Sequence, residues 1–337
     1  MIRLRRLWPL LPVLLLAACA RAAGPVQRSF FAMGTLVEVT LYDVPQERAE
    51  RLLDDIEADF QRMHHEWHAW EEGPLVHVNR AIAQGRSVEI PAVIAPLLPP
   101  AIRLSEASNH LFNPAIGRLI ALWGFQSDEP ARQPPDPADI ERLVRANPRM
   151  TDLVIEDGRL RSRNPMVQLD FGGFAKGWAI DRVIEKLRAA GVENAIVNAG
   201  GDLRAIGRHG DRPWRVGVRH PRSKDALLAV LEVEGDESVF TSGDYERYFE
   251  YRGRRYHHII DPRTGWPAEG AASVTLIHRE AATADAAATA LLIAHEDEWQ
   301  EIARRMGIDQ VLRVERDGRI VMTPAMARRA RLLDKRP

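Results

Sequence analysis

Stretches with the two-residue period of a β-strand and stretches with the 3.6-residue period of an α-helix follow one another irregularly along this chain. Residues 36–41 alternate apolar and polar side chains, which predicts a strand. The apolar residues within 49–63 fall on one helical face, which predicts a helix. Two further strand patterns, 194–198 and 202–206, meet at a Gly-Gly pair. Since strands and helices do not alternate regularly, the sequence predicts an α+β fold rather than a doubly wound parallel sheet.

The rest of the chain adds segments of both kinds and contains no internal repeat. Further predicted elements are a helix from about Pro100, a helix from an Asn113-Pro114 N-cap to Trp123, a strand over 167–170, a helix over 174–187, a hairpin over 245–256, a helix over 283–294 and a hairpin over 310–321. The composition of residues 127–137 predicts a surface loop. Neither side of this loop looks self-contained, so we expect one domain over residues 29–327 and a basic tail over 328–337.

Composition and charge exclude several classes of protein. The 337 residues are 45% hydrophobic and 28% charged, which excludes disordered, collagen-like and multi-span membrane chains. The 46 basic and 47 acidic residues give a net charge of -1, whereas nucleic-acid-binding proteins usually carry a basic excess. We therefore expect no nucleic-acid partner. The single cysteine, Cys19, excludes an intramolecular disulfide and a cysteine metal cluster.

The first 18 residues have the pattern of a secretory signal peptide, with basic residues, a short apolar run and small residues before a cleavage point. The apolar run is about half of the ~20 residues that a membrane-spanning helix needs. The sequence Leu-Ala-Ala-Cys ending at Cys19 resembles the bacterial lipobox, in which the cysteine is lipidated and becomes the mature N-terminus. We therefore expect a signal peptide over 1–18, a lipid on Cys19 and a tether over 19–28. The alternative is an ordinary signal peptide cleaved nearby, with an incidental cysteine.

Glycines lie between a predicted strand and a predicted helix in the run from Asp170 to Gly177. Glycine lets backbone N–H groups approach an anion at the positive end of a helix. The glycine spacing matches neither the P-loop nor the dinucleotide-binding fingerprint. Two interpretations stay open: an anion site, or a tight turn that leaves the Lys176 side chain in solvent.

Asp285 and Thr289 are four residues apart in an alanine-rich predicted helix, so both side chains project from one face. A carboxylate and a hydroxyl on a surface of small residues suit a hard cation such as Mg²⁺ that also holds substrate phosphates. The alternative is capping of the helix by Thr283 or Asp285, on a face that serves only for packing.

Two histidine clusters are candidates for further chemistry. The histidine pair ending at His258 precedes Asp-Pro and Thr-Gly turn pairs, which place it at the end of a strand. A histidine there acts as a general base or hydrogen-bonds a phosphate, unless the strand is only a surface strand. His64 and His68 share a predicted helical face, but their order is not the His-Glu-x-x-His of metalloproteases, so a solvated helix end is the favoured interpretation. Trp70, just beyond, is a candidate platform for a flat ligand.

Taken together and in this order, the motifs resemble those of the ApbE family of FAD:protein FMN transferases. They are Met33-Gly34-Thr35, Phe112-Asn113-Pro114 with Leu122-Trp123-Gly124-Phe125, Asp170 to Gly177, Asn198-Ala199-Gly200-Gly201-Asp202, His258 to Gly265, and Ala284-Asp285 to Thr289. The resemblance runs from about Phe30 to Val321. It implies a single ApbE-like unit of mixed sheets and helices, preceded by a lipoprotein signal peptide and anchored by lipid on the periplasmic side of the inner membrane.

The resemblance also implies roles for individual residues. Positions that contact FAD in the family are matched by Met33, Trp70, Leu111, Phe112, Asn113, Asp170, Lys176 and Ile260. Mg²⁺ ligands are matched by Asp285, Thr289 and the backbone carbonyl of Gly173. His258 matches a conserved histidine, as a base or as a phosphate contact, and Asp261 is the other candidate base. Asn113 stands where the family usually has Asp, and Gly173 replaces a more usual Ala, Ser or Thr.

The implied activity is Mg²⁺-dependent transfer of the FMN moiety of FAD to a threonine or serine hydroxyl of a partner protein, with release of AMP. The implied partners are FAD and an acceptor subunit of a membrane redox complex. Two alternatives share the motifs: a pyrophosphatase that cleaves FAD to FMN and AMP with water, and a non-catalytic flavin-binding lipoprotein. The Asp285 and Thr289 pair argues against the second alternative, because binding alone needs no Mg²⁺ on the diphosphate.

Overall fold

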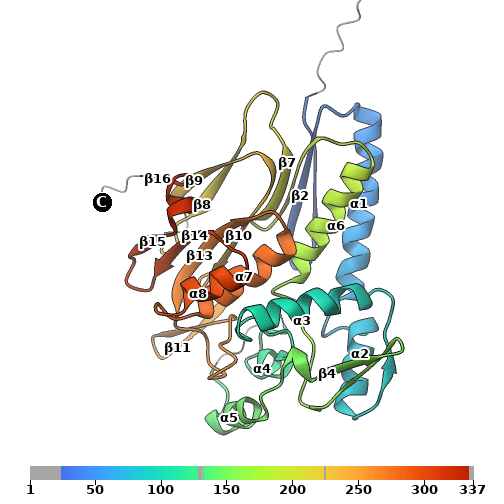
Figure 1. Ribbon diagram of the computed structural model, residues 1–337, viewed down its shortest axis with the longest axis vertical. Coiled ribbons are helices and arrows are strands. Elements are labelled where there is room, and N and C mark those ends of the chain that lie inside the picture. The colour runs from blue at the N-terminus through green and yellow to red at the C-terminus, as the bar shows by residue number, and fades with distance from the viewer. Residues whose placement is uncertain (1–23, 128–130, 132, 224, 334–337) are drawn as a thin grey trace, which may run out of the picture.

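In the computed structural model, which describes residues 24–127, 131, 133–223 and 225–333, an antiparallel sheet of eight strands runs through the centre of the molecule (Figure 1). Its strands, in spatial order, are β1 (Val26–Ala32), β2 (Thr35–Tyr42), β6 (Asn194–Ala199), β7 (Asp202–Gly207), β10 (Gly235–Gly243), β13 (Ala271–His278), β14 (Gln310–Glu315) and β15 (Ile320–Met322). In β2 every second side chain, Val37, Val39 and Leu41, is fully buried, as the period of two predicts.

Helices cover one face of this sheet. α1 (Gln46–Glu66) packs against β1, while α6 (Ala175–Ala189) packs against β6 and β7 (Figure 1). α7 (Ala281–Ile293) lies against β10 and β13 and is surrounded by α6, α3 (Leu98–Ala107) and α8 (Trp299–Arg305). Because it has neighbours on all sides, α7 is buried along nearly its whole length, and it has no polar face.

A smaller three-stranded sheet covers part of the opposite face. It contains β8 (Trp214–Arg219), β9 (Leu227–Val233) and β16 (Arg331–Leu332), next to the short helix α9 (Pro324–Ala327). Trp214 and Leu231 of this sheet belong to one apolar cluster with Leu203, Val239 and Leu312 of the central sheet. The two sheets therefore share a core.

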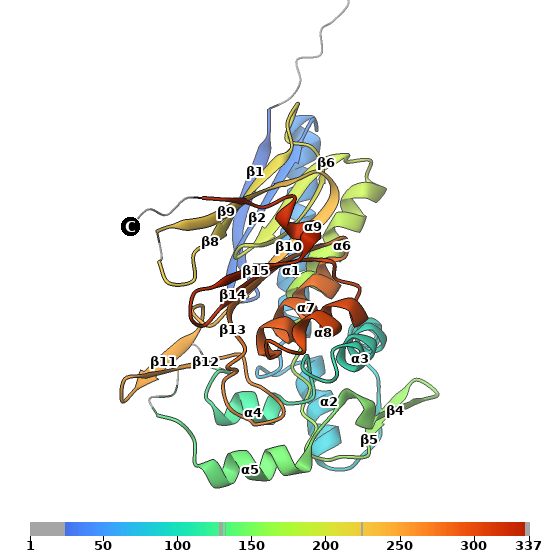
Figure 2. The same ribbon diagram turned by 60° about the vertical axis from the view of Figure 1, so that its left-hand side comes forward.

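The remaining elements gather at the end of the molecule away from the first described residues (Figure 2). They are α2 (Pro74–Ala83), β3 (Val88–Glu89), a 3-10 turn at Ala95–Leu97, α4 (Gly117–Leu122), α5 (Pro137–Ala146), a 3-10 turn at Met150–Asp152, β4 (Leu153–Glu156), β5 (Arg159–Ser162), β11 (Tyr248–Tyr251) and β12 (Arg254–His257). Trp123 stacks on Tyr256 at 5.7 Å between ring centres, and its indole N–H donates to the carbonyl of Gly265 at 2.8 Å. This aromatic core joins α4 to the segment that follows β12.

Most predicted elements are confirmed, among them the helices over 49–63, 174–187 and 283–294 and the hairpins over 245–256 and 310–321. The described part of the 127–137 segment is irregular until α5 begins. No described helix is both long and apolar enough to cross a membrane. Cys19, the signal peptide and the first half of the expected tether, residues 19–23, lie outside the described residues. The expected end of the tether at residue 28 is wrong, because residues 26–28 pair with β2 as the start of β1.

Two predicted elements are wrong, and for one reason. The helix expected from Asn113 begins only at Gly117, and residues 167–170 form an isolated bridge rather than a strand. The backbone of the two segments pairs instead, since the N–H of Gln168 donates to Ala115 (3.1 Å) and that of Asp170 to Pro114 (2.8 Å). Backbone groups that are already paired across the fold are not available for a helical turn.

Candidate active site

Asp285 and Thr289 lie on α7, whose alanine side chains allow close packing against α6 and the sheet. Asp285 is only 5% exposed, and its Oδ2 accepts a hydrogen bond from the backbone N–H of Gly177 at 3.0 Å. A Cβ atom on Gly177 would lie 2.8 Å from the Cα of Ala282, so only glycine permits this approach of the two helices. The approach brings the first turn of α6 to the carboxylate of Asp285.

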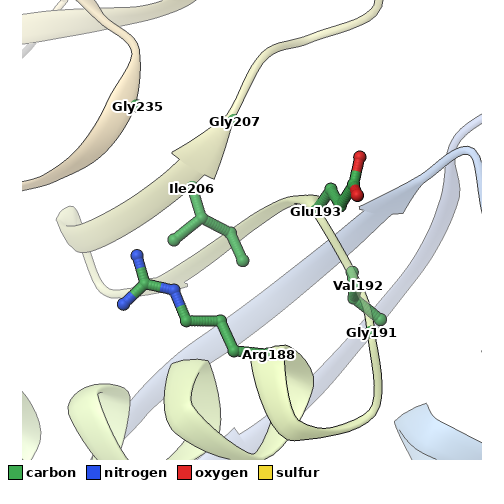
Figure 3. Close-up of a pocket in the computed structure, with 7 residues that line it drawn as sticks. All are labelled: Arg188, Gly191, Val192, Glu193, Ile206, Gly207 and Gly235. Carbon is green, nitrogen blue, oxygen red and sulfur yellow. The ribbon is translucent and has the colours of Figure 1, made fainter.

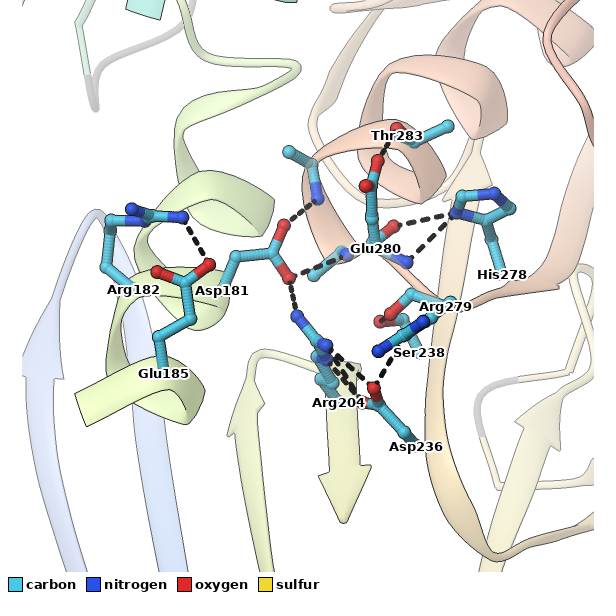
Figure 4. A network of polar contacts seen from close by, with 12 residues as sticks. Asp181, Arg182, Glu185, Arg204, Asp236, Ser238, His278, Arg279, Glu280 and Thr283 are labelled. Atoms are coloured by element: carbon cyan, nitrogen blue, oxygen red, sulfur yellow. Dashed lines mark hydrogen bonds and ion pairs between the residues drawn. The ribbon is translucent and has the colours of Figure 1, made fainter. Parts of the chain in front are cut away.

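A buried network of ion pairs holds the start of α7 (Figure 4). Asp181 on α6 accepts hydrogen bonds from the N–H groups of Ala281 and Ala282, both at 2.9 Å. Arg204 on β7 pairs with Asp181 and with Asp236. The carboxylate satisfies backbone donors that a helix start leaves unpaired. The network therefore sets the position of α7, and with it that of Asp285, relative to α6.

Gly173 lies opposite Thr289, in the turn before α6. A Cβ atom built on Gly173 would lie 3.3 Å from the Thr289 hydroxyl oxygen. The turn is closed by a hydrogen bond from the N–H of Gly172 to the carboxylate of Asp170, at 2.8 Å. The structure thus brings together the three residues expected to bind Mg²⁺, although they come from two segments far apart in the sequence.

The donor atoms at this place fit a hard cation. A carboxylate, a hydroxyl and a backbone carbonyl are oxygen ligands, and Mg²⁺ commonly takes one or two carboxylates together with substrate phosphates. Burial raises the pKa of Asp285 to about 6, although the charge of Lys176 opposes the rise. The described residues contain no group of three or more His, Cys, Asp or Glu side chains that could hold a metal. A cation bound here would therefore be held by oxygen atoms of different kinds from the protein, together with phosphate oxygens of the substrate.

Lys176 reaches the same place from the first turn of α6. Its ammonium group pairs with Asp202, at the start of β7, and its side chain is 25% exposed. Burial by itself would lower the pKa of Lys176, but the carboxylates of Asp202 and Asp285 raise it above its ordinary value. Lys176 is therefore a fixed cation, and the interpretation that left it in solvent is wrong.

His258 follows β12, with its Nδ1 3.2 Å from the backbone carbonyl of Arg247. Because a carbonyl only accepts, Nδ1 carries the proton and Nε2 is left as an acceptor. Burial, followed by the nearby His257 and Arg247, lowers the pKa of His258 to about 3. The ring is therefore neutral at physiological pH, and Lys176 lies within its electrostatic reach.

Asp261, the other candidate base, is engaged elsewhere. Its two carboxylate oxygens accept hydrogen bonds from the guanidinium group of Arg263 at 3.0 and 2.8 Å. Arg263 also pairs with Glu298, at 2.8 Å. Asp261 is only 4% exposed, and its backbone carbonyl accepts the N–H of Gly265 at 2.8 Å. This geometry gives Asp261 a role in holding the turn and leaves His258 as the candidate base.

The residues expected to contact FAD divide into two groups. Met33, at the β1–β2 turn with a φ of +52°, and Trp70, in the loop after α1, are partly exposed at the edge of the main core. Asp170 is half-buried, and burial raises its pKa against the opposing hydrogen bond from Gly172. The second group has side chains that are almost completely buried: Leu111, Phe112, Asn113 and Ile260. In the structure without a ligand, these four residues therefore present little surface to a nucleotide.

Comparison with known proteins identifies the family. The model of the ApbE family matches residues 33–312. The chain belongs to the ApbE family.

Relatives in this family support the assignment. A FAD:protein FMN transferase from Rhodobacter capsulatus is 44% identical over 310 residues, which are 92% of this chain but 59% of the relative. A FAD:protein FMN transferase from Vibrio cholerae is 30% identical over 90% of this chain and 92% of its own length. A crystal structure of the ApbE protein from Thermotoga maritima superposes with a TM-score of 0.82, at 32% identity, over 91% of this chain and 99% of that one. For the flavin transferase ApbE from Vibrio cholerae the TM-score is 0.80, at 26% identity, over 92% and 100%.

Asn113, where the resemblance led us to expect an aspartate, has both ends of its amide in use. Its oxygen accepts from the N–H of Ala115 at 3.1 Å, and its nitrogen donates to the carbonyl of Pro148 at 2.9 Å. The side chain thus ties two loops together, and its amide retains one N–H and one oxygen lone pair that these two bonds do not use.

Three residues of this ApbE site were not assigned roles from the sequence: Asp181, Asp202 and Arg247. Asp181 interrupts the apolar face of its helix, a buried charge that could have indicated a partner. Asp202 ends a recognised motif without an evident role. Arg247 lies within electrostatic reach of both Asp170 and His258, and nothing in its local sequence indicates this.

Other candidate sites lie away from this centre. A cavity of about 390 Å³ is lined by residues such as Arg188, Glu193 and Ile206 (Figure 3), and the larger hollow of about 680 Å³ borders the ion-pair network of Asp181. Neither is lined by a predicted site residue. His64 and His68 do not share a helical face as predicted, because α1 ends at Glu66 and His68 accepts backbone N–H groups of the next loop. Their rings are nevertheless neighbours, with ring centres 5.4 Å apart in an edge-on arrangement.

Proposed function

We propose that this chain is a FAD:protein FMN transferase, which moves the FMN moiety of FAD to a threonine or serine hydroxyl of a partner protein and releases AMP in a Mg²⁺-dependent reaction. The observation that carries the proposal is the meeting of Asp285, Thr289 and Gly173 beside the fixed cation of Lys176. The two relatives from Rhodobacter capsulatus and Vibrio cholerae bear the name of this activity.

The diphosphate of FAD is the part of the substrate that these residues suit. Lys176 presents a partly buried ammonium group that stays charged, and a charged ammonium binds phosphate oxygens through charge-assisted hydrogen bonds. Asp285, Thr289 and the carbonyl of Gly173 would hold Mg²⁺, which supplies charge neutralisation to a diphosphate when it is bound. Positioning and electrostatic stabilisation account for most of the rate enhancement in phosphoryl transfer.

His258 has the protonation state that a proton acceptor needs. In the proposed reaction the acceptor hydroxyl gives its proton to Nε2 as its oxygen bonds to the FMN-side phosphorus. The bond from that phosphorus to the AMP-side oxygen breaks, and AMP leaves with the electron pair. An imidazolium with a pKa of about 3 returns its proton readily, so the phosphate of the departing AMP receives it.

The test is incubation of the purified protein with FAD, Mg²⁺ and an acceptor domain, followed by in-gel flavin fluorescence and measurement of AMP. Fluorescent acceptor together with AMP supports the transferase. AMP without labelled acceptor means that the protein is a pyrophosphatase, and neither product means that it only binds flavin. The Asp285→Ala variant serves as the metal-site control, and Glu47→Ala, a change at an exposed ion pair of α1, as the matched neutral control.

We propose further that the protein is a lipoprotein, anchored through Cys19 on the periplasmic side of the inner membrane, where its acceptor is a subunit of a membrane redox complex. The lipobox pattern at Cys19 supports the lipid anchor, and the acceptor in a membrane redox complex is what the resemblance to the ApbE family implies. Wild-type protein is expected to incorporate labelled palmitate and to fractionate with the inner membrane. A Cys19→Ser variant that retains both properties would disprove the anchor.

A further inference from the structure

Asp202 ends the Asn-Ala-Gly-Gly-Asp motif, and the proposed reaction leaves it without a role. The motif forms the turn between β6 and β7. Gly200 and Gly201 have φ values of +69° and +102°, and the N–H of Gly201 donates to the side-chain oxygen of Asn198 at 2.8 Å. A Cβ atom on Gly200 would lie 3.2 Å from the Cβ of Thr35 in the neighbouring hairpin. The turn therefore fixes where the Asp202 side chain begins.

The carboxylate of Asp202 is held at both oxygens. Oδ1 accepts the backbone N–H of Thr241 at 2.9 Å, and Oδ2 pairs with the ammonium group of Lys176. The regular pairing of β7 with β10 ends at Leu203 and Val239. The N–H of Thr241 lies beyond the last strand-to-strand hydrogen bond of this pair, and it donates to the Asp202 carboxylate instead. A backbone donor within a sheet is rigid, and the position of Lys176 is rigid in consequence.

Lys176 has three carboxylates within electrostatic reach, those of Asp202, Asp285 and Glu246, and among the described residues it pairs only with Asp202. Asp202 and Asp285 both contribute to the raised pKa of its ammonium group. Within the described part of the chain, however, the ion pair of Lys176 is with Asp202 and none is formed with Asp285. Asp285 thus keeps one carboxylate oxygen that accepts no hydrogen bond from a described residue.

We propose that Asp202 is a positioning residue: it holds the ammonium group of Lys176 where the diphosphate of FAD binds and prevents Lys176 from closing onto Asp285. The inference rests on the proposed function only in taking FAD as the ligand. When the Asp202 charge is removed, Lys176 turns to Asp285, so that FAD loses its cation and the metal-binding carboxylate is blocked.

The direction in which FAD affinity changes when the Asp202 charge is removed distinguishes the positioning role from a simple effect of charge. Removal of a carboxylate beside an anion site should strengthen the binding of an anion such as FAD. The positioning role predicts the opposite, because the cation moves away. Asp202→Asn is the appropriate change, since its amide oxygen still accepts the N–H of Thr241.

The experiment is a double-mutant cycle on the full chain, with the Kd of FAD measured by flavin fluorescence in excess Mg²⁺. Asp202→Asn is expected to weaken FAD binding about tenfold, the effect of one lost charge-assisted hydrogen bond. Lys176→Met is expected to weaken binding at least as much, and the double variant no further than Lys176→Met. Asp54→Asn, which removes a 67% exposed carboxylate on α1, is expected to leave the Kd unchanged.

Three results would overturn the inference: unchanged or tighter binding in Asp202→Asn, normal binding in Lys176→Met, or the same additional loss from Asp202→Asn in the Lys176→Met background. Thermal unfolding shows whether each variant folds, and Asp202→Glu, which displaces the charge but retains it, replaces Asp202→Asn if that variant does not fold. Labelling of the acceptor by the wild type is measured separately. If the Kd values follow the expected cycle but the acceptor is not labelled, the transferase is refuted and the positioning role stands. If the acceptor is labelled but the Kd values do not follow the expected cycle, the positioning role is refuted and the transferase stands.

Discussion

Asp285 is the residue at which stability and activity oppose each other. Its pKa of about 6 in the folded chain exceeds the ordinary value of about 3.9. The stabilising contribution of a carboxyl group with a raised pKa is complete below about pH 4 and is lost as the pH rises through about 6. At neutral pH the metal-free protein therefore contains a buried charge that Lys176 and the N–H of Gly177 compensate only in part, and a bound cation would neutralise it.

We expect Asp285→Asn to abolish FMN transfer and, at the same time, to stabilise the metal-free protein by about 2 kcal/mol at pH 7. The amide keeps an oxygen acceptor for the N–H of Gly177, so the helix contact survives. Denaturant unfolding in EDTA at pH 7 and at pH 4 measures the effect, which should vanish at the lower pH. If Asp285→Asn were less stable than the wild type at pH 7, the ionised Asp285 carboxylate would not be destabilising the metal-free protein, and the prediction would be wrong.

His258 leads to a prediction about the rate and its pH dependence. His258→Ala should lower kcat by about 10²- to 10⁴-fold, while the Kd of FAD changes little, because the ring is assigned to the acceptor proton. Since the pKa of His258 is about 3 and that of Asp285 about 6 in the metal-free chain, the acid limb of the wild-type pH profile should lie near pH 6 at limiting Mg²⁺ and move to lower pH as Mg²⁺ fills the site. His65→Ala, at an exposed histidine on α1, is the control. An equal loss of FAD affinity in His258→Ala would make it a phosphate contact instead.

Among the secondary-structure elements, the contact between α6 and α7 decides whether the site exists. The contact depends on Gly177 of α6, which lies against the backbone of α7, and on the alanines along α7. It also depends on the carboxylate of Asp181, which accepts hydrogen bonds at the start of α7. None of these features touches the substrate in the proposed reaction. Each one nevertheless sets the distance between the turn at Gly173 and the side chains of α7.

Gly177→Ala should therefore damage both the fold and the site. The added Cβ would lie 2.8 Å from the Cα of Ala282, and overpacking of this kind costs about 1–3 kcal/mol. We expect a lower unfolding temperature and weaker Mg²⁺-dependent binding of FAD. Gly24→Ala, where no atom lies within 4 Å of the new Cβ, is the matched control. If Gly177→Ala were as stable as the wild type, the close approach of α6 and α7 would not be required.

For the molecule as a whole, the site joins the helix-covered sheet to the region built around Trp123. Lys176 and Asp285 come from the first part, and His258 follows β12 in the second. A ligand that contacts both parts binds only the folded chain, so its binding stabilises the fold.

FAD and Mg²⁺ added together should raise the unfolding temperature more than the sum of their separate effects. At a ligand concentration one hundred times the Kd, the added stability is about 2.7 kcal/mol. Scanning calorimetry with FAD, with Mg²⁺ and with both measures this, and EDTA should remove the Mg²⁺-dependent part. Equal stabilisation by FAD with and without Mg²⁺ would show that the metal ion does not contribute to the binding of the nucleotide.

Local features of this protein could be predicted from short stretches of its residues. The alternation of residues 36–41 identified a half-buried strand, and the four-residue spacing of Asp285 and Thr289 placed both on one face of a helix. The order of the motifs indicated the ApbE family, which the comparisons confirm. These conclusions were accessible because a repeating pattern records the environment of each side chain over a short stretch of chain.

Which distant groups meet depends on how the whole chain packs, and the residue pattern did not predict it. The pairing of Pro114 and Ala115 with residues 168–170 prevented the helix expected at Asn113. The partner of Lys176 is Asp202, 26 residues away, and the N–H groups at the α7 start are capped by Asp181, about 100 residues away. A buried donor or charge must find a partner wherever the packed chain supplies one, and sequence spacing carries no record of that choice.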